Sequence, residues 1–259
     1  MVKERAGIQS VEVGFGLLQV LGQAPGPLML RDLAREAGMS AAKAHRYLVS
    51  FQRLQLVVQD AASTRYDLGP AALKLGLASL SRLDAVKLAR ERIGALMEQM
   101  GHTLALAVWG NHGPTIVHWE ESPQAVTVNL RLGDVMPLLS SATGRCFAAY
   151  VSKEAVTPLV KDEIARAQNQ GRSDVPTTLA QARELLDEVR RRGLSRVVDT
   201  LLPGIVGFCA PVFDADGHMV LGMVALGPSG TFDPAWDGAM ATPLKRAALQ
   251  LSHDLGWAG

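Results

Sequence analysis

The side chains best suited to binding an anion lie together in residues 39–57, the stretch MSAAKAHRYLVSFQRLQLV. This stretch carries Lys43, His45, Arg46 and Arg53 among alanine, leucine, valine and phenylalanine residues. At 100° per residue around a helix, Lys43, Arg46 and Arg53 share one face, opposite the apolar side chains. Such a face is either ordinary solvated surface or a surface that lies against phosphate groups, and the neighbouring elements decide between the two.

A second candidate for anion binding is the stretch SSATGR, at the predicted start of a helix. The first N–H groups of a helix have no partner within it, and the helix dipole favours a negative charge there. Ser141, Ala142 and Thr143 are therefore candidates to hold a carboxylate. A serine that only caps the helix gives the same letters, so both interpretations stay open.

Histidine and cysteine, the usual ligands of transition metals, are poorly spaced for a metal site. His102, His112 and His118 are close in sequence, but alternation along a strand and a turn at His112 give no reason for them to converge. Cys146 and Cys209 lack CxxC or Cys/His spacing and are expected to be buried free thiols. We expect neither a metal ion nor a cofactor.

Motifs of nucleophilic and phosphate chemistry are absent from the sequence. It contains no Gly-x-Ser-x-Gly elbow and no GxxxxGK[ST] loop. These absences argue against an enzyme. A small-molecule-binding hydrolase without DNA binding remains the alternative class.

The composition is that of a globular protein with an uneven charge. The chain has 259 residues, of which 48% are hydrophobic and 20% charged. Residues 1–82 carry ten Lys and Arg against six Asp and Glu, a net charge of +4, and the remainder carries −3. No apolar run reaches the roughly 18 residues that span a bilayer, and the start MVKERAGIQS has no signal-peptide core. We expect a cytoplasmic protein with no membrane contact, whose N-terminal part approaches an anionic partner.

The elements around residues 39–57 favour a winged helix-turn-helix. Apolar periodicity predicts a helix over residues 10–21, and a second, short helix over residues 30–37 ends at Gly38. Ser40 caps a third helix, and residues 56–68 read as a hairpin whose tip ends at Arg65. In such a unit the helix after the turn enters the major groove of DNA. The residues predicted to contact DNA are Ser40, Ala42, Lys43, His45, Arg46, Ser50 and Arg65.

Residues 69–101 read as two consecutive helices, the first a connector, and the rest of the chain reads as an α+β domain. Strands are predicted at residues 103–110, 114–121, 125–133, 194–201, 205–213 and 219–228. Helices are predicted at residues 141–152, 153–167, 178–193 and 234–255. Because tight turns join neighbouring strands, we expect an antiparallel sheet with packed helices.

Residues 10–76 resemble the DNA-binding domain of the IclR family of bacterial transcription regulators. The stretches PLLSSATGRCFAAY, RRRGLSRVVDT and GIVGFCAPVFDADGHMVLGMVALGP resemble that family's effector-binding domain. The resemblance implies a winged helix-turn-helix domain over residues 1–69, a connector helix over 70–83 and a GAF-like effector-binding domain over 84–259. The family usually begins its recognition helix with a Pro-Lys-Ser-Thr type of sequence. This chain has Ser40, Ala41, Ala42 and Lys43, so its base preference is expected to differ.

The resemblance also implies an effector pocket at the SSATGR helix start, with the amides of Ala142 and Thr143 holding a carboxylate. Family members that bind very small polar acids line this pocket with a cysteine and two serines, where this chain has Gly207, Val224 and Leu226. Each buried ligand oxygen left unpaired costs about 1–3 kcal/mol. We therefore expect an aromatic or hydrophobic carboxylic acid, with a small aliphatic acid such as glyoxylate or pyruvate as the alternative. The predicted effector-binding residues are Val128, Leu130, Met136, Ser141, Ala142, Thr143, Asp199, Gly207, Cys209, Val224 and Leu226.

The sequence thus predicts a ligand-responsive repressor or activator of a catabolic operon. The expected pathway is the breakdown of aromatic compounds. A single winged domain makes too few DNA contacts for tight specific binding, so a homodimer or a dimer of dimers on double-stranded operator DNA is expected. Asp199 has two open interpretations: it accepts a hydrogen bond from a phenolic hydroxyl of the ligand, or it is an ordinary surface residue.

Overall fold

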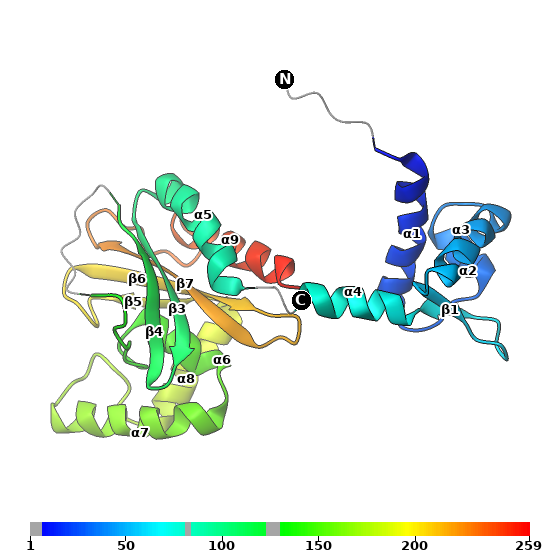
Figure 1. Cartoon of the computed structure of the whole chain (residues 1–259). Helices are drawn as coiled ribbons and strands as arrows, with labels where there is room; N and C mark the ends of the chain where they lie inside the picture. Colours follow the sequence, from blue (N-terminus) through cyan, green and yellow to red (C-terminus); the bar gives the residue numbers. More distant parts are fainter. Residues whose placement is uncertain (1–6, 81–83, 123–129) are drawn as a thin grey trace. The chain divides into compact units, whose positions relative to one another are not determined.

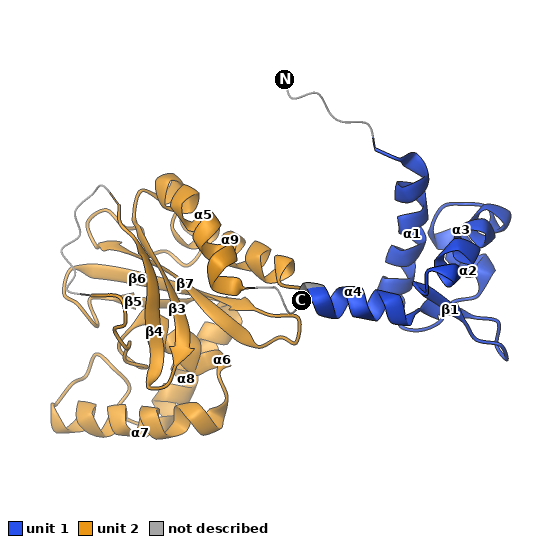
Figure 2. Cartoon of the chain, viewed as in Figure 1, with its two compact units in different colours: residues 1–83 blue, residues 84–259 orange. Residues whose placement is uncertain are grey.

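The computed structural model describes residues 7–80, 84–122 and 130–259. The chain divides into two compact units, Met1–Leu83 and Asp84–Gly259, which Figure 2 shows in different colours. Each unit has its own hydrophobic core. The two units are described separately below.

Unit 1 is a winged helix-turn-helix, as predicted. In chain order it contains α1 (Gln9–Gln23), α2 (Leu30–Glu36), α3 (Ala41–Arg53), β1 (Val57–Gln59), β2 (Tyr66–Leu68) and α4 (Pro70–Leu80) (Figure 1). The turn between α2 and α3 is short because Gly38 adopts a positive φ of 64° and Ser40 caps α3 by accepting the N–H of Lys43. Leu17, Leu33 and Leu48 are fully buried where α1, α2 and α3 meet.

Unit 2 is built on one antiparallel sheet. Its strands are β3 (Thr103–Gly110), β4 (Gly113–Glu120), β5 (Ser195–Val198), β6 (Ile205–Phe213) and β7 (Met219–Pro228). They lie in the order β4-β3-β7-β6-β5, and every neighbouring pair is antiparallel. The helices are α5 (Ala85–Met100), α6 (Ala142–Tyr150), α7 (Lys153–Asn169), α8 (Leu179–Arg192) and α9 (Ala241–Asp254). This confirms the predicted α+β class.

The two faces of the sheet pack against different helices because side chains alternate along each strand. On β3, Leu104 and Leu106 belong to the core that contains α5 and α9, whereas Ala105 and Ala107 belong to the core that contains α6. Helices α7 and α8 pack outside α6 in a further apolar cluster (Figure 1). The α6 face carries small side chains on β3, which leaves room for α6 to approach the sheet.

Three predicted elements differ from the structure. The predicted helix 234–255 begins only at Ala241, because the carboxylate of Asp233 accepts the N–H groups of Ala235 and Ala239 and holds a turn there. The predicted strand 194–201 ends at Val198, since residues 199–204 form a loop. Of the predicted strand 125–133, residues 130–133 form a loop with a turn, and the rest lies outside the described residues.

Candidate functional site

The exposed face of α3 carries basic side chains that no acidic side chain of the described residues neutralises. Ala44 and Leu48 are buried in the core of unit 1, and Lys43, His45 and Arg46 are exposed on the other side of the helix. Among the described residues, none of these three side chains makes an ion pair or a side-chain hydrogen bond. On α2, by contrast, Arg35 lies 2.9 Å from Asp32. The basic side chains of α3 are therefore available to phosphate groups or base edges.

The other residues predicted to contact DNA have structural partners. The Ser40 hydroxyl accepts the N–H of Lys43 at 3.3 Å, and the Ser50 hydroxyl donates to the carbonyl of Arg46 at 3.4 Å. Arg65 donates from Nη1 to the carbonyl of Pro27 at 3.0 Å, which ties the hairpin to the turn between α1 and α2. Arg65 remains exposed and keeps further N–H groups for a phosphate. Ala42 is exposed in the first turn of α3.

In unit 2, the residues before α6 are folded tightly against the start of that helix. The Ser141 hydroxyl donates to the carbonyl of Pro137 at 2.7 Å and accepts the N–H of Gly144 at 2.8 Å. A Cβ on residue 144 would lie 1.9 Å from the Pro137 carbonyl oxygen, so only glycine fits there. The Glu163 carboxylate of α7 accepts the N–H groups of Leu138 and Leu139, at 2.5 and 2.8 Å.

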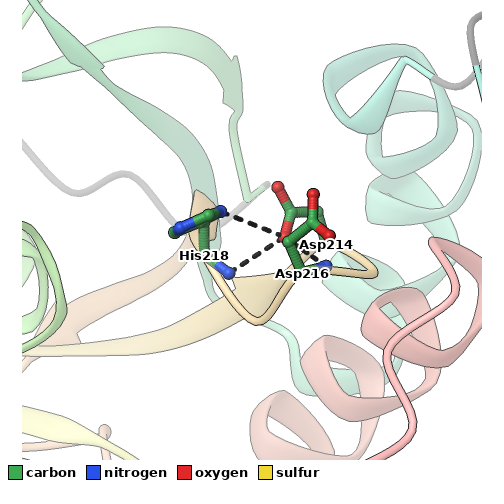
Figure 3. Close-up of side chains that lie close together, drawn as sticks. All are labelled: Asp214, Asp216 and His218. Carbon is green, nitrogen blue, oxygen red and sulfur yellow. Dashed lines mark hydrogen bonds and ion pairs between the residues drawn. The ribbon is translucent and has the colours of Figure 1, made fainter.

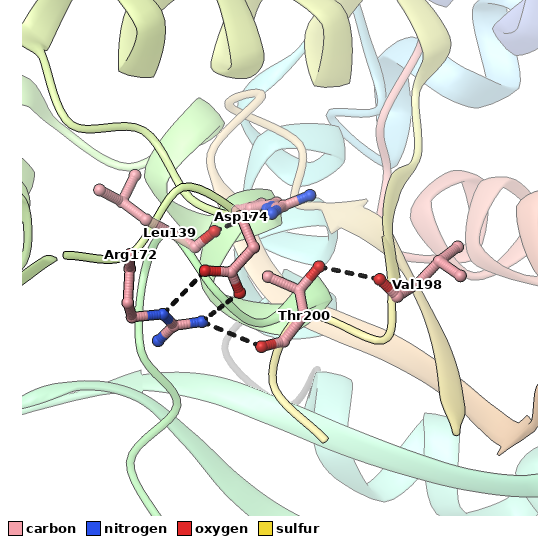
Figure 4. A network of polar contacts seen from close by, with 6 residues as sticks. Leu139, Arg172, Asp174, Val198 and Thr200 are labelled. Carbon is pink, nitrogen blue, oxygen red and sulfur yellow. Dashed lines mark hydrogen bonds and ion pairs between the residues drawn. The ribbon is translucent and has the colours of Figure 1, made fainter. Parts of the chain in front are cut away.

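A buried guanidinium, that of Arg145, also holds the residues before α6 in place. Arg145 donates to the carbonyl of Leu139 through Nε and to the carbonyl of Arg196 through Nη1, both at 2.8 Å. Burial lowers the pKa of Arg145 to about 10, which leaves it charged at neutral pH. Nearby, Arg172 pairs with Asp174 and donates to the Thr200 carbonyl at 3.0 Å (Figure 4). The bonds of Arg145 tie α6 to the residues before it and to β5, and those of Arg172 hold the loop after β5.

Two N–H groups at the start of α6 are left without a partner among the described residues, those of Ala142 and Thr143. Both residues are buried. Ser141 thus caps the helix through the N–H of Gly144 and still leaves two amides free, so capping and anion binding are compatible in one segment.

A cavity of about 40 Å³ lies at this helix start, against β6 and β7. The pairing of β6 with β7 forms the sheet side of the cavity, where Gly207 of β6 lies opposite Leu226 of β7. Of the predicted effector-binding residues, the structure places eight around this cavity: Leu130, Met136, Ser141, Ala142, Thr143, Gly207, Val224 and Leu226. Among the described residues, no charged side chain lines it. The arrangement suits an anionic group at the helix start and an apolar body against the sheet.

Two predicted residues that the structure describes are not part of this lining. Cys209 is fully buried on β6 in the core beneath α6, and Asp199 is exposed and accepts the N–H of Gly204 at 2.7 Å within its own loop. Val128 lies outside the described residues. Four lining residues were not anticipated: Val197, Leu201, Leu202 and Ile205. The signal that could have found them is the apolar run in SRVVDTLLPGIV, interrupted by a turn.

The three histidines considered as metal ligands, His102, His112 and His118, do not lie together at one site. His102 is buried against Phe232, His112 lies in the β3–β4 turn and His118 bonds Glu120 at 3.2 Å. A different group, Asp214, Asp216 and His218, lies in the β6–β7 turn (Figure 3). There, Oδ1 of Asp214 accepts the N–H groups of Asp216 and His218, at 3.0 and 2.9 Å, so the turn itself accounts for this carboxylate.

Comparison with known proteins covers nearly the whole chain. Residues 10–61 match the IclR helix-turn-helix domain, and residues 77–253 match the bacterial transcriptional regulator IclR C-terminal domain. The chain is 32% identical to the glycerol operon regulatory protein of Streptomyces griseus over 257 residues, which is 96% of this chain and 97% of that protein. Within the described part of the chain, no helix is both long and apolar enough to cross a membrane.

Solved structures of similar proteins also cover nearly the whole chain. Pseudomonas aeruginosa HmgR is similar with a TM-score of 0.89 and 36% identity, over 97% of this chain and all of that one. The Agobacterium tumefaciens repressor BlcR shares the fold, with a TM-score of 0.81 and 20% identity over 97% of this chain and 99% of that one. The proteins of these comparisons are transcriptional regulators, not enzymes.

Proposed function

The chain belongs to the IclR family of DNA-binding transcriptional regulators, and we propose that it responds to a carboxylic acid with an aromatic or hydrophobic body. The observation that carries this proposal is the cavity at the start of α6, which combines the two free amides of Ala142 and Thr143 with apolar walls. The amides bind the carboxylate. Val224, Leu226 and Met136 contact the body of the acid.

The apolar walls decide which acid fits. A small acid such as glyoxylate carries oxygens at both ends, and Gly207, Val224 and Leu226 offer no side-chain donor to the second end. Each buried oxygen without a hydrogen bond costs about 1–3 kcal/mol. An aromatic acid presents its oxygens at one end only, so the amides satisfy them and its ring removes apolar surface from water. The balance favours the larger acid.

The size of the cavity means that binding must rearrange its walls. The cavity measures about 40 Å³, whereas a cavity of about 150 Å³ holds benzene. An aromatic acid therefore selects a packing of unit 2 in which lining side chains have moved. A ligand that binds one packing better than the other shifts the population between them, which is what a regulator requires.

The same volume is the observation that supports the second candidate, a small aliphatic acid such as glyoxylate or pyruvate. Such an acid needs less movement of the walls, at the cost of unpaired oxygens. The two candidates make opposite predictions for ligand binding.

Benzoate is expected to raise the melting temperature of the full chain, and glyoxylate and pyruvate are expected not to. A ligand present at 100 times its Kd stabilises the protein that binds it by about 2.7 kcal/mol. Differential scanning calorimetry measures the shift. In Gly207→Val, whose added side chain points toward Val197 and Ala142, the benzoate shift should disappear. Stabilisation by glyoxylate or pyruvate but not by benzoate would favour the small acid instead.

We place the DNA-binding surface on α3 and the hairpin. Lys43, His45 and Arg46 are proposed to reach base edges and phosphates, and Arg65 a phosphate beside the hairpin, with Ser40, Ala42 and Ser50 close to the DNA backbone. What supports this is that Lys43 and Arg46 are exposed and have no ion-pair partner among the described residues, and that α3 follows a short helix and turn.

Homodimerisation is proposed to use α4. Three leucines of this helix are largely exposed, Leu73 at 63%, Leu75 at 65% and Leu77 at 55%, and Lys74 is its one charged residue. A helix that is apolar all round is normally buried. A second copy of the chain is the occupant we propose, because a regulator that reads repeated half-sites needs two such units.

Leu73→Ser/Leu77→Ser is expected to shift the protein from dimer toward monomer in sedimentation-velocity experiments. Two buried leucines contribute roughly 1.5–3 kcal/mol each when removed from water, so their loss weakens the dimer strongly. Leu249→Ser on α9, at a leucine that is 47% exposed, is the matched control and should leave the dimer intact. Equal behaviour of both variants would remove α4 from the interface.

A further inference from the structure

The small cavity at the start of α6 shares a wall with a larger pocket. Leu201 lines the cavity of about 40 Å³ on one side and an outer pocket of about 250 Å³ on the other. The outer pocket lies between the loop before α6 and the C-terminal half of α7, and it carries Arg166 and Arg172. Within the described part of the chain, Leu201 is the residue that lines both spaces, and the outer pocket alone is slightly smaller than the roughly 300–1,000 Å³ of small-molecule sites.

Hydrogen bonds hold the two ends of the loop that carries Leu201: the N–H of Asp199 donates to the Ile205 carbonyl at 3.0 Å, and Oδ1 of Asp199 accepts the N–H of Gly204 at 2.7 Å. Residues 199–204 connect β5 to β6, and Leu201 is only half-buried. Arg172 holds the loop by donating to the carbonyl of Thr200, the residue before Leu201, while Arg172 itself pairs with Asp174 (Figure 4). Both partners of this ion pair are substantially exposed, and exposed ion pairs contribute little to stability. The middle of the loop, at Thr200 and Leu201, is therefore held less firmly than its two ends.

The opposite wall is fixed. Met136 separates the cavity from another pocket, of about 270 Å³, but it is only 5% exposed, and its N–H donates to the Pro114 carbonyl at 2.7 Å. Two residues further on, Leu138 is held by Glu163. A ligand that needs more room than the cavity gives is thus directed past Leu201, not past Met136.

The outer pocket offers a cation for the far end of the ligand, Arg166, which also lines the pocket of about 270 Å³ behind Met136. Arg166 uses Nε to donate to the carbonyl of Asp162 at 3.3 Å, and within the described parts of the chain no carboxylate lies within ion-pair distance of its guanidinium. Its neighbour Glu163 is engaged with the amides of Leu138 and Leu139. Arg166 is therefore free to donate to an oxygen of the ligand.

We propose that the ligand site extends past Leu201 into the outer pocket, and that Arg166 binds a second oxygen-bearing group, hydroxyl or carboxylate, at the far end of the acid. Leu201 is the movable wall, and Arg172 positions it through Thr200. The inference rests on the proposed function, because the first carboxylate of the ligand is the one held by Ala142 and Thr143. It identifies the effector class as a bifunctional acid.

Calorimetric titration of the full chain with benzoate, 4-hydroxybenzoate and benzene-1,4-dicarboxylate tests this extension. At least one of the two para-substituted acids should bind about tenfold more tightly than benzoate, as a charge-assisted hydrogen bond provides. Arg166→Gln should abolish this advantage and leave benzoate unchanged. Lys161→Gln, which removes an exposed cation from the same helix, should preserve the advantage. Leu201→Ala should tighten the binding of all three acids, because the wall no longer has to move.

Each other outcome has a distinct meaning. If benzoate binds and neither para group improves its affinity, or if Arg166→Gln and Lys161→Gln behave alike, the extension is wrong while the proposed function stands. If Met136→Ala tightens binding and Leu201→Ala does not, the ligand extends the other way and the role of Leu201 is overturned. If none of the three acids binds the wild-type chain, the proposed function and the extension fail together.

Discussion

Replacement of Lys43 and Arg46 by alanine should lower the affinity for operator DNA by about 100-fold, since a contact to a base or phosphate contributes roughly 1–3 kcal/mol and each 1.4 kcal/mol is tenfold. Both side chains extend from the exposed face of α3 and have no partner within the described part of unit 1. Their removal therefore breaks no hydrogen bond or ion pair of the described residues. The loss in affinity reports contacts to DNA and not damage to the fold.

Fluorescence anisotropy with an operator fragment obtained by binding-site selection measures this loss. Repeated at several salt concentrations, it should give a smaller salt dependence for the double variant, because each phosphate contact contributes about 0.9 to the slope of log K against log salt. Arg31→Ala/Arg35→Ala is the matched control, since it removes the same charge from α2, where both arginines lie close to Asp32. If the control loses as much affinity as the α3 variant, only net charge matters and α3 is not the recognition helix.

Local patterns in the sequence were enough to predict unit 1 and most of unit 2. Gly38 ends one helix and Ser40 begins the next within a few residues, and the structure shows both signals acting through local backbone geometry. The strand 103–110 was predicted with its observed bounds, because its alternating residues fit both faces of a covered sheet. Features that depend on residues near one another in the chain are therefore predictable.

The shape of the cavity depends on contacts between distant residues, which a single sequence does not display. Leu201 and Leu202 look like the end of a strand, but Asp199 bonds the N–H of Gly204 and turns the chain, which brings these leucines to the cavity. The volume of the cavity cannot be predicted from the sequence either, because it is the small space that remains after the side chains have packed closely. The resemblance to a family pointed to the start of α6 and to eight of the residues that line this cavity, but not to Val197, Leu201, Leu202 and Ile205 and not to its volume.

Gly144 shows the same limit and leads to the second prediction. In the sequence it is a poor helix former inside a predicted helix. In the structure an added Cβ would lie 1.9 Å from the carbonyl oxygen of Pro137, 2.5 Å from its carbon and 2.6 Å from Cα of Leu138. All three are backbone atoms, so no change of rotamer relieves the clash.

Gly144→Ala is therefore expected to reduce the free energy of unfolding of unit 2 by about 3 kcal/mol or more, the upper range for overpacked sites. In a domain of this size that corresponds to a fall in melting temperature of roughly 6–12 °C. The clash also pushes the loop before α6 away from the helix, so the amides of Ala142 and Thr143 are no longer held in position at the cavity. The stabilisation by benzoate should therefore vanish as well.

The matched control is Gly94→Ala in α5, where the nearest atom to an added Cβ is Oε1 of Glu120 at 3.9 Å. There alanine should raise stability by about 0.5–1 kcal/mol, because glycine costs a helix interior that much in conformational entropy. Calorimetry on both variants separates the general effect of glycine in a helix from the specific contact with Pro137. A melting temperature for Gly144→Ala at or above that of the wild type would show that the loop does not press on α6. The anion site would then lose its structural basis, because the tight loop is what fixes the two free amides at the cavity.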